Sequence, residues 1–297
     1  MTESRARRLW KVLEPYHAIT YFAPDTRKAT DALGLRGGWM SYFACRAAPL
    51  GPVGPGLVTA VFYNFHPSMV ARAIPDAWSF ATPAQLLTAR LEAVDSAVRR
   101  FPPTSTPVRR AAELARQAAE LAPTAGRPLG AANAALDWPD EPHLVLWQAS
   151  TILRESRGDG HVAALVGAQL SPCQACVTIS AAGGPSKEVF QLNRRWSDEE
   201  WAAAEEDLRV RGLLDADGVL TEAGRALRQQ VEDTTDRLAE QGWSAFGDSN
   251  AEELDRLVRP ISGAIMANGL VPADNPMAMR WEPADLPTPT ASADPGK

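Results

Sequence analysis

Residues 171–226 read SPCQACVTISAAGGPSKEVFQLNRRWSDEEWAAAEEDLRVRGLLDADGVLTEAGRA, and this stretch decides the predicted fold. A short helix over about 186–192 is followed by a turn and by a second helix, which Ser197 caps and Arg211 ends. Asp217-Gly218 predicts a tight hairpin, and the next helix is expected to begin near Thr221. The predicted order is helix, turn, helix, wing, helix, with the wing a small β-hairpin.

The cadence of Arg211-Gly-Leu-Leu, Asp217-Gly and Leu220-Thr-Glu-Ala-Gly closely resembles the winged helix of MarR-type transcription regulators. The resemblance covers residues 171–226 and implies a fold that can bind DNA. Regulators of this type pair through terminal helices, so the resemblance also implies a homodimer. It leaves the function open, because unrelated functions are built on one scaffold.

The charge of the second predicted helix disfavours DNA as its partner. In a DNA reader this helix enters the major groove, and cations that neutralise phosphate supply much of the affinity. Only Arg209 and Arg211 are basic here, both at the far end. The acidic residues of the helix are Asp198, Glu199, Glu200, Glu205, Glu206 and Asp207. DNA therefore stays an alternative, and a structural or ligand-binding role is preferred.

The composition is that of a globular protein with about two domains. The chain has 297 residues, of which 45% are hydrophobic, and a formal net charge of −6. This acidity argues against a general polyanion binder. No apolar run is long enough for a membrane span, and residues 1–17 lack the apolar stretch of a signal peptide. A cytoplasmic location and no membrane partner are the resulting expectations.

The predicted fold class is mainly α, with four parts along the chain. Residues 1–101 form a helical N-terminal domain, and residues 102–141 hold a Pro-rich linker and an Ala-rich helix. Residues 142–270 form the winged-helix domain, and 271–297 are a Pro-rich tail. Within these parts, 57–65 is predicted as a helix with a strand as the alternative, and 143–157 and 160–169 are predicted as separate helices.

Cys173-x-x-Cys176 has two open interpretations. A redox pair needs a thiolate whose pKa is lowered at a helix N-terminus, and Ser171-Pro172 does predict a helix start. A closed zinc site needs four ligands, and this motif supplies two. Buried structural thiols are preferred, with redox or metal roles as the alternative.

The first candidate site is Leu13-Glu14-Pro15-Tyr16-His17, followed by Tyr21. Glu14 and His17 share a helix face at this spacing, although Pro15 indicates that the helix begins or ends nearby. A carboxylate that orients an imidazole can serve acid–base chemistry, with Tyr21 donating to a ligand. The alternative is a helix-end Glu and a satisfied, packed His.

The second candidate site is the charged stretch from Arg154 to His161. Asp159 is expected to cap a new helix, whose first turn would lower the pKa of His161 and favour a neutral base. Arg154 and Arg157 are three residues apart and could clamp a carboxylate or phosphate. The alternative is a helix junction with surface salt bridges.

The third candidate site is Asn64 with His66, set among the aromatic residues of 62–65. These groups could line a pocket, or they could be core with one polar turn. No phosphate loop, dinucleotide glycine motif or nucleophile elbow is present. The sequence names no metal and no cofactor.

The whole chain also resembles an actinobacterial family of helix-turn-helix proteins whose function is unassigned. The resemblance rests on 14–17, Tyr21-Phe22, 46–51, 157–161 and the winged helix. It implies an N-terminal helical domain fused to a degenerate winged helix. The leading hypothesis is a protein that binds a small organic molecule. Its more specific form is an enzyme of secondary metabolism that uses His17 or His161 as base, with Glu14 and Asp159 orienting them. A ligand-responsive DNA-binding regulator is the alternative.

Overall fold

The computed structural model describes residues 3–100, 107–272 and 277. It is 75% helical with 15 α-helices, and the prediction of a mainly α fold is confirmed. Many helices begin with proline in the first turn, where its fixed φ suits the helix and its missing N–H costs no hydrogen bond. The four-part domain division stays a prediction. The linker at 101–106 and the tail from 273, except Met277, lie outside the described residues.

The first half of the chain holds eight α-helices and one 3-10 turn at 48–50. Their bounds are α1 Arg5–Phe22, α2 Pro24–Ala32, α3 Gly37–Ala47, α4 Pro55–Phe62, α5 Pro67–Ala71, α6 Ala77–Phe80, α7 Pro83–Arg100 and α8 Val108–Glu120. The second half holds seven. Their bounds are α9 Pro128–Ala134, α10 Pro142–Gly167, α11 Pro172–Ala181, α12 Lys187–Arg194, α13 Asp198–Val210, α14 Glu222–Phe246 and α15 Asp248–Ala267.

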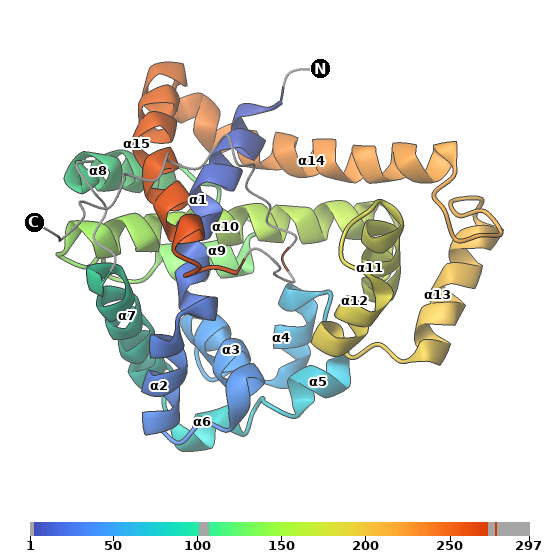
Figure 1. Cartoon of the computed structure of the whole chain (residues 1–297), viewed down its shortest axis with the longest axis horizontal. Coiled ribbons are helices and arrows are strands. Elements are labelled where there is room, and N and C mark those ends of the chain that lie inside the picture. The colour runs from blue at the N-terminus through green and yellow to red at the C-terminus, as the bar shows by residue number, and fades with distance from the viewer. Residues whose placement is uncertain (1–2, 101–106, 273–276, 278–297) are drawn as a thin grey trace, which may run out of the picture.

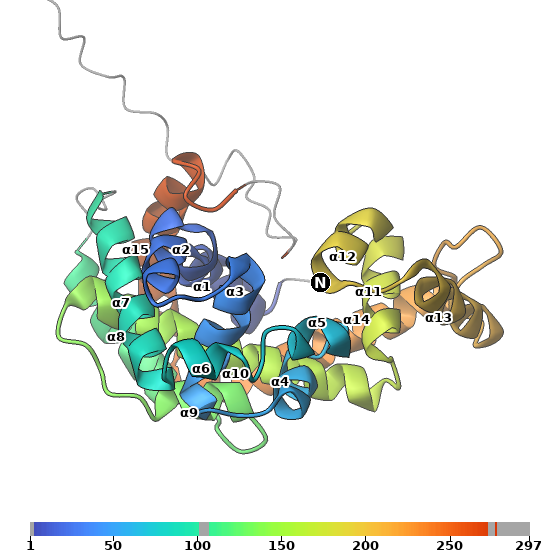
Figure 2. The same ribbon diagram turned by 90° about the horizontal axis from the view of Figure 1, so that it is seen from below.

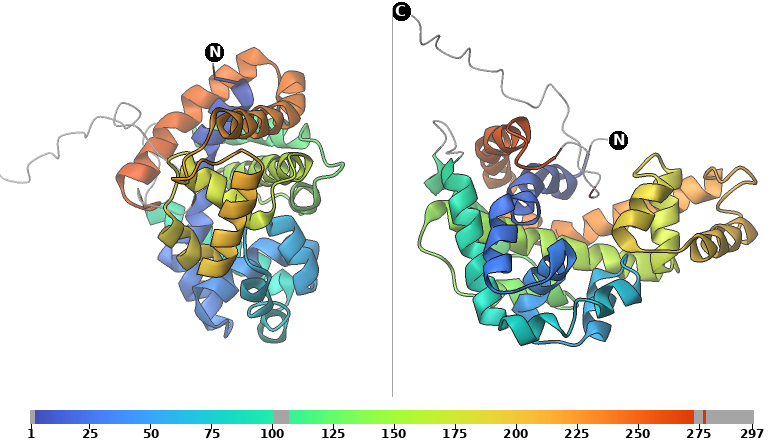
Figure 3. Two further views of the ribbon diagram at one scale, coloured as in Figure 1. Left: turned by 90° about the vertical axis from the view of Figure 1, so that its right-hand side faces the viewer. Right: turned by 60° about the horizontal axis from the view of Figure 1, so that its bottom comes forward.

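Two long arms of helix carry two lobes (Figure 1). Helices α10 and α14 lie side by side and lead to the lobe of α11, α12 and α13. Helices α2 and α7 lie side by side and lead to the lobe of α3 to α6. Figure 2 shows α3 to α6 in the middle of the view and α11 to α13 on the right, with α10 running along below. Both arms meet where α1, α8, α10 and α15 pack together, as the two views of Figure 3 also show.

The buried side chains form three apolar clusters that follow this arrangement. The largest joins α1, α8, α10 and α15, and it includes Leu9, Leu114, Trp147 and Leu254. A second fills the lobe of α3 to α6, and a third fills the lobe of α11 to α13. Burial of these clusters supplies most of the folding free energy, since apolar burial contributes about 25 cal/mol per Å².

The helix-turn-helix was predicted correctly, but the prediction of a β-hairpin wing is wrong. Ser197 caps α13 with a reciprocal bond from Glu200, which makes a capping box. After α13 the described chain has no strand, only the isolated bridge between Leu214 and Leu220. The bridge has one hydrogen bond on each side, from Asp215 N–H to Val219 O at 2.9 Å and from Thr221 N–H to Leu213 O at 3.1 Å. Helix α14 begins at Glu222, directly after Thr221, so the ladder does not extend into a strand.

Two further expectations fail at residues that usually break helices. Helix α10 runs unbroken through Gly158 and Gly160, so Asp159 caps no helix. At Gly160 a Cβ would lie 1.9 Å from Arg127 Nη1, so close packing explains this glycine better than a helix end does. Helix α1 likewise continues through Pro15, which is buried against its neighbours. The stretch 57–65 is helical over most of its length, as preferred.

Candidate ligand-binding site

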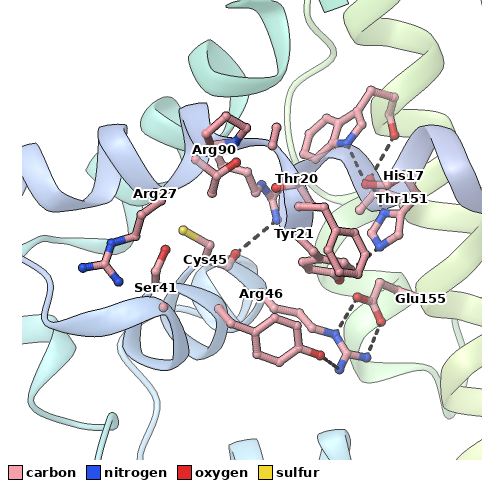
Figure 4. Close-up of a pocket in the computed structure, with 17 residues that line it drawn as sticks. His17, Thr20, Tyr21, Arg27, Ser41, Cys45, Arg46, Arg90, Thr151 and Glu155 are labelled. Carbon is pink, nitrogen blue, oxygen red and sulfur yellow. Dashed lines mark hydrogen bonds and ion pairs between the residues drawn. The ribbon is translucent and has the colours of Figure 1, made fainter. Parts of the chain in front are cut away.

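A cavity of about 140 Å³ lies where α1, α2, α3, α7 and α10 converge. Figure 4 shows polar side chains from these helices pointing toward one another across it. Its wall combines aromatic surface with charged and hydroxyl groups, including His17, Tyr21, Arg46, Arg90, Thr151 and Glu155. Ligand sites typically combine apolar surface with a few convergent polar groups in this way.

His17 is held in one tautomer by its neighbours. Its Nδ1 lies 3.0 Å from Thr151 Oγ1, and its Nε2 lies 3.0 Å from the Tyr21 hydroxyl. The single Thr151 proton is donated to Trp147 O at 2.9 Å, so Thr151 accepts from His17 Nδ1–H. Tyr21 then donates to the lone pair of His17 Nε2. Burial and the guanidinium of Arg154 hold the pKa of His17 well below its ordinary value, which fits a neutral ring.

Glu155 is the charged centre beside this pair, and the sequence analysis did not single it out. Arg46 donates to it in bidentate fashion at 2.8 and 2.9 Å, and Arg154 donates at 3.1 Å. Its side chain is 1% exposed. Burial alone would raise the pKa of Glu155, but Arg46 and Arg154 together hold it well below its ordinary value. The carboxylate is therefore ionised and fully engaged.

Glu14 lies behind the cavity and does not line it. It accepts from Arg154 Nε at 3.2 Å and from Trp10 Nε1 at 3.0 Å. Burial raises its pKa, and Arg154 opposes that effect. Glu14 and Arg154 instead line a second cavity of about 30 Å³, which is large enough for a water molecule. The hydrogen bonds of Glu14 go to Arg154 and Trp10, whereas those of His17 go to Thr151 and Tyr21.

Arg90 on α7 is a buried cation with weak partners. Nη1 donates to Cys45 O at 3.2 Å, and Nη2 lies 3.5 Å from Asn133 Oδ1. Nε is buried and has no hydrogen-bond partner among the described residues. The guanidinium carbon of Arg90 lies 5.0 Å from the centroid of the Trp147 ring, a cation–π contact. Burial lowers the pKa of Arg90.

The remaining predicted residues of α10 face other helices. Arg157 pairs with Asp236 at 2.7 Å, and Asp159 accepts from Gly130 N–H at 2.8 Å. His161 lies 2.9 Å from Thr235 Oγ1 on α14. Since His161 follows Thr151 by ten residues, it is about 15 Å further along the helix axis than the His17 contact. His161 does not line the cavity that His17 lines.

Asn64 and His66 lie at the contact between the two lobes. Asn64 O accepts from Trp196 Nε1 at 3.0 Å. His66 caps α5, and its Nε2 lies 2.9 Å from Glu200 Oε1. Neither residue lines the cavity.

The two cysteines of the CxxC motif are buried on α11 as free thiols. Burial raises the pKa of Cys173 and of Cys176 to about 12, the opposite of the shift that activates a redox thiolate. Among the described residues, no cluster of His, Cys, Asp and Glu is arranged to hold a metal ion.

The comparison with protein families covers both the cavity and the helix-turn-helix. A family model described as "Helix-turn-helix family" matches residues 6–272. The chain belongs to the helix-turn-helix family. No curated protein and no solved structure matches this helix-turn-helix family member significantly. Within its described residues, no single helix is both long and apolar enough to cross a membrane, and only α10 with α11, bent by 97°, passes as a pair.

The second helix of this helix-turn-helix protein presents carboxylates to solvent. The side chains of Asp198 and Glu206 are 77% and 68% exposed. Arg209, the basic residue within α13, lies 3.5 Å from both Glu205 and Glu206. The basic charge of α13 is therefore already engaged, and its exposed surface is acidic.

Proposed function

We propose that this helix-turn-helix family member binds a small organic molecule in the cavity between α1, α3, α7 and α10. The helix-turn-helix then serves as scaffold rather than as a reader of bases. The acidic α13 supports this choice, because carboxylates repel the phosphates that a DNA reader must approach.

One observation carries the proposal. The chain of hydrogen bonds from Tyr21 through His17 to Thr151 is fixed at the wall of the 140 Å³ cavity. A cavity of about 150 Å³ in another protein holds a benzene molecule, so this one suits a single ring or a short chain. Fixed polar groups beside aromatic surface would then orient the bound molecule.

An enzymatic form of this proposal uses the same residues. Tyr21 would give its proton to a bound molecule only if His17 released the bond to its hydroxyl. Once that bond is released, the lone pair of His17 Nε2 could accept a proton from the bound molecule, and the neutral ring suits that role. Turnover, a part in secondary metabolism and an actinobacterial origin stay predictions.

Thermal shift with single-ring compounds tests the binding proposal. The panel is phenol, benzyl alcohol, benzamide, benzylamine and benzoate. Cys45 lines the cavity, so Cys45→Met should fill it and Cys45→Ala should leave it open. A ligand at 100 times its Kd stabilises a protein by about 2.7 kcal/mol. We expect at least one compound to raise the Tm of the native protein and of Cys45→Ala, but not of Cys45→Met. No shift with any compound, or a shift that survives in Cys45→Met, contradicts the proposal.

A ligand-responsive, MarR-like DNA-binding regulator is the second candidate, and the family match favours it. Its test is retention of genomic DNA fragments over a salt titration. Sequence-specific retention at cellular ionic strength with a steep salt slope would support the regulator and overturn the scaffold role.

A further inference from the structure

We infer that the molecule bound in this cavity is a small organic carboxylate, seated on Arg90. The inference rests on the proposed function and adds the chemical class of the ligand. Arg90 is 5% exposed, lines the cavity and has an unpaired Nε–H. Its two remaining contacts, to Cys45 O and Asn133, involve neutral groups. Figure 4 shows its guanidinium reaching between α1 and α3 toward Cys45.

The charges around the cavity do not balance. Three guanidiniums line it, those of Arg27, Arg46 and Arg90, against one carboxylate, that of Glu155. Arg27 pairs with Asp31 at 2.7 Å, and Arg46 pairs with Glu155 at 2.8 Å. Arg90 is therefore the cation left over. An isolated buried charge costs several kcal/mol, and an anion beside it would offset that cost.

The lining favours an organic anion over an inorganic one. Tyr21, Phe22, Tyr42 and Trp147 supply aromatic surface around the guanidinium. A carboxylate can take two parallel N–H bonds from one guanidinium edge, while an apolar body covers the rings. An inorganic anion would leave that aromatic surface exposed to water.

Calorimetric titration of the full chain with matched probes tests this inference. Benzoate and benzamide have nearly the same shape and differ in charge. We expect benzoate to bind at least tenfold more tightly than benzamide, and Arg90→Gln to remove that preference. Because Arg90 is buried, Arg90→Met supplies a readout that needs no ligand. It should unfold at the same Tm as the native protein or higher in anion-free buffer, since it removes an unpaired charge.

The outcomes separate the inference from the proposal beneath it. If benzamide and benzoate bind with equal affinity, the inference that the ligand is a carboxylate is overturned, and the proposal that the cavity binds a small molecule stands. No binding by either, together with no thermal shift from the wider panel, overturns both. If chloride or phosphate raises the Tm as much as benzoate does, the inference that the ligand is organic is overturned. A large loss of stability in Arg90→Met would show that Arg90 already has the partner it needs.

A second inference rests on a different observation, the repeated order of helices. A first unit (residues 5–120) and a second unit (residues 142–267) each have a long arm, three short helices, a connecting segment and two final helices. In the first unit the connecting segment also holds the four-residue α6. In this order α1 with α2 corresponds to α10, and α3, α4 and α5 correspond to α11, α12 and α13. Helices α7 and α8 correspond to α14 and α15.

Left-handed backbone positions recur at one spacing in the two units. Gly37, Gly51 and Tyr63 have positive φ in the first unit, and Gln169, Gly183 and Arg195 have it in the second. Each residue of the second set follows its counterpart by 132 positions. Positive φ is uncommon for residues other than glycine, so three coincidences at one spacing point to a shared backbone path.

The start of the second long helix also recurs. Thr82 and Thr221 each accept a hydrogen bond from the backbone N–H three residues on, at 3.3 and 3.1 Å. Ahead of each threonine stands the same dipeptide at the same distance, Asp76-Ala77 and Asp215-Ala216.

The two units exchange part of their first arms, while α10 and α2 also pack on α14 and α7 of their own units. Helix α1 of the first unit packs on α15 and α14 of the second, and α10 of the second packs on α8 and α7 of the first. Reciprocal packing of this kind is typical of a two-fold interface between copies of one protein. The cavity lies at this interface, because α10 contributes Trp147, Thr151 and Glu155 to a wall built otherwise by the first unit.

We propose that the chain is two related helix-turn-helix units fused in one polypeptide, which acts as a monomer with one ligand site. A reading helix is incomplete in the first unit, where α5 has 5 residues against 13 in α13. The fused pair thus offers no two matching helices for a palindromic DNA site. The homodimer expected from the terminal helices is the competing outcome.

Native mass spectrometry and melting over a hundredfold range of concentration test the fusion. We expect one species of 32.0 kDa and a Tm that does not change with concentration. A dimer whose Tm rises with concentration would mean that α1 packs on the α15 of another copy, and it would overturn the proposal.

Discussion

Replacing Glu155 with glutamine tests whether the buried ion network holds α3 and α10 together. The carboxylate accepts three hydrogen bonds from two guanidiniums, at 2.8, 2.9 and 3.1 Å. Glu155→Gln keeps the shape of the side chain but removes its charge. Arg46 then has no counter-charge, and Arg154 has only Glu14. Breaking a buried pair from one side costs about 3–5 kcal/mol. For a chain of this size, that loss lowers the Tm by roughly 6–20 °C.

Glu14→Gln is the matched control, because it makes the same change on the facing helix. Glu14 meets one guanidinium instead of two, and burial already raises its pKa toward the neutral form. We expect a loss of about 1 kcal/mol or less, since the amide oxygen keeps accepting from Trp10 or Arg154. Urea unfolding at pH 7 with an unchanged m value measures both variants. Equal losses in the two variants, or a loss under about 1 kcal/mol in Glu155→Gln, would refute the reasoning.

The difference in unfolding free energy between the native protein and Glu155→Gln depends on pH with a definite sign. Because the folded-state pKa of Glu155 is depressed below its ordinary value of 4.5, its stabilising contribution is present above that pH. It is lost as the pH falls through the folded-state pKa. The gap in unfolding free energy between native protein and Glu155→Gln should therefore be constant from pH 7 to about 5 and shrink in more acidic buffer.

Three further predictions concern other parts of the fold. A Cβ at Gly224 would lie 2.1 Å from Leu213 O, so Gly224→Ala should cost about 1–3 kcal/mol in urea unfolding, whereas Gly167→Ala meets open space and should cost nothing measurable. Ser197→Ala removes the cap of α13 and should cost about 0.5–2 kcal/mol, with Ser197→Asp as a variant that keeps it. Burial lowers the pKa of His161 to about 4, so its NMR titration midpoint should lie near pH 4, and its contribution to stability is lost as the pH falls from about 6.5 toward 4. A midpoint near 6.5 would contradict the buried position.

The helix-turn-helix was predictable because its signals are local. Ser186, Ser197 and Thr221 are N-caps within a few residues of the hydrogen bonds they accept. The wing failed because Asp217-Gly218 specifies a turn but not the length of the ladder beside it. The break predicted near Gly160 failed for a different reason. The packing of Arg127, a residue far away in sequence, decides that position.

Part of the candidate site could be predicted from the sequence. His17 and Tyr21 are four residues apart on one helix, so their contact follows from spacing alone. Arg46, Arg90 and Glu155 come from three different helices, and nothing local marks them as neighbours. A charged residue within an otherwise apolar helical stretch was the available signal, as with Arg46 after Phe43-Ala44-Cys45. The repeat was also hidden, because the two units share backbone path more than residue identity.

The exchange of first helices bears on how the protein is made. Helix α1 is synthesised before the other described helices, yet Val12 O accepts a hydrogen bond from Ser262 in α15. Domains that fold during synthesis do so from the N-terminus onward, but the surface that α1 packs on is complete only after α15 has emerged. The apolar face of α1 that contacts α15 therefore stays uncovered until α15 has been synthesised. Contacts between segments so far apart in sequence slow folding, and the apolar surface that is exposed meanwhile is one that chaperones can bind.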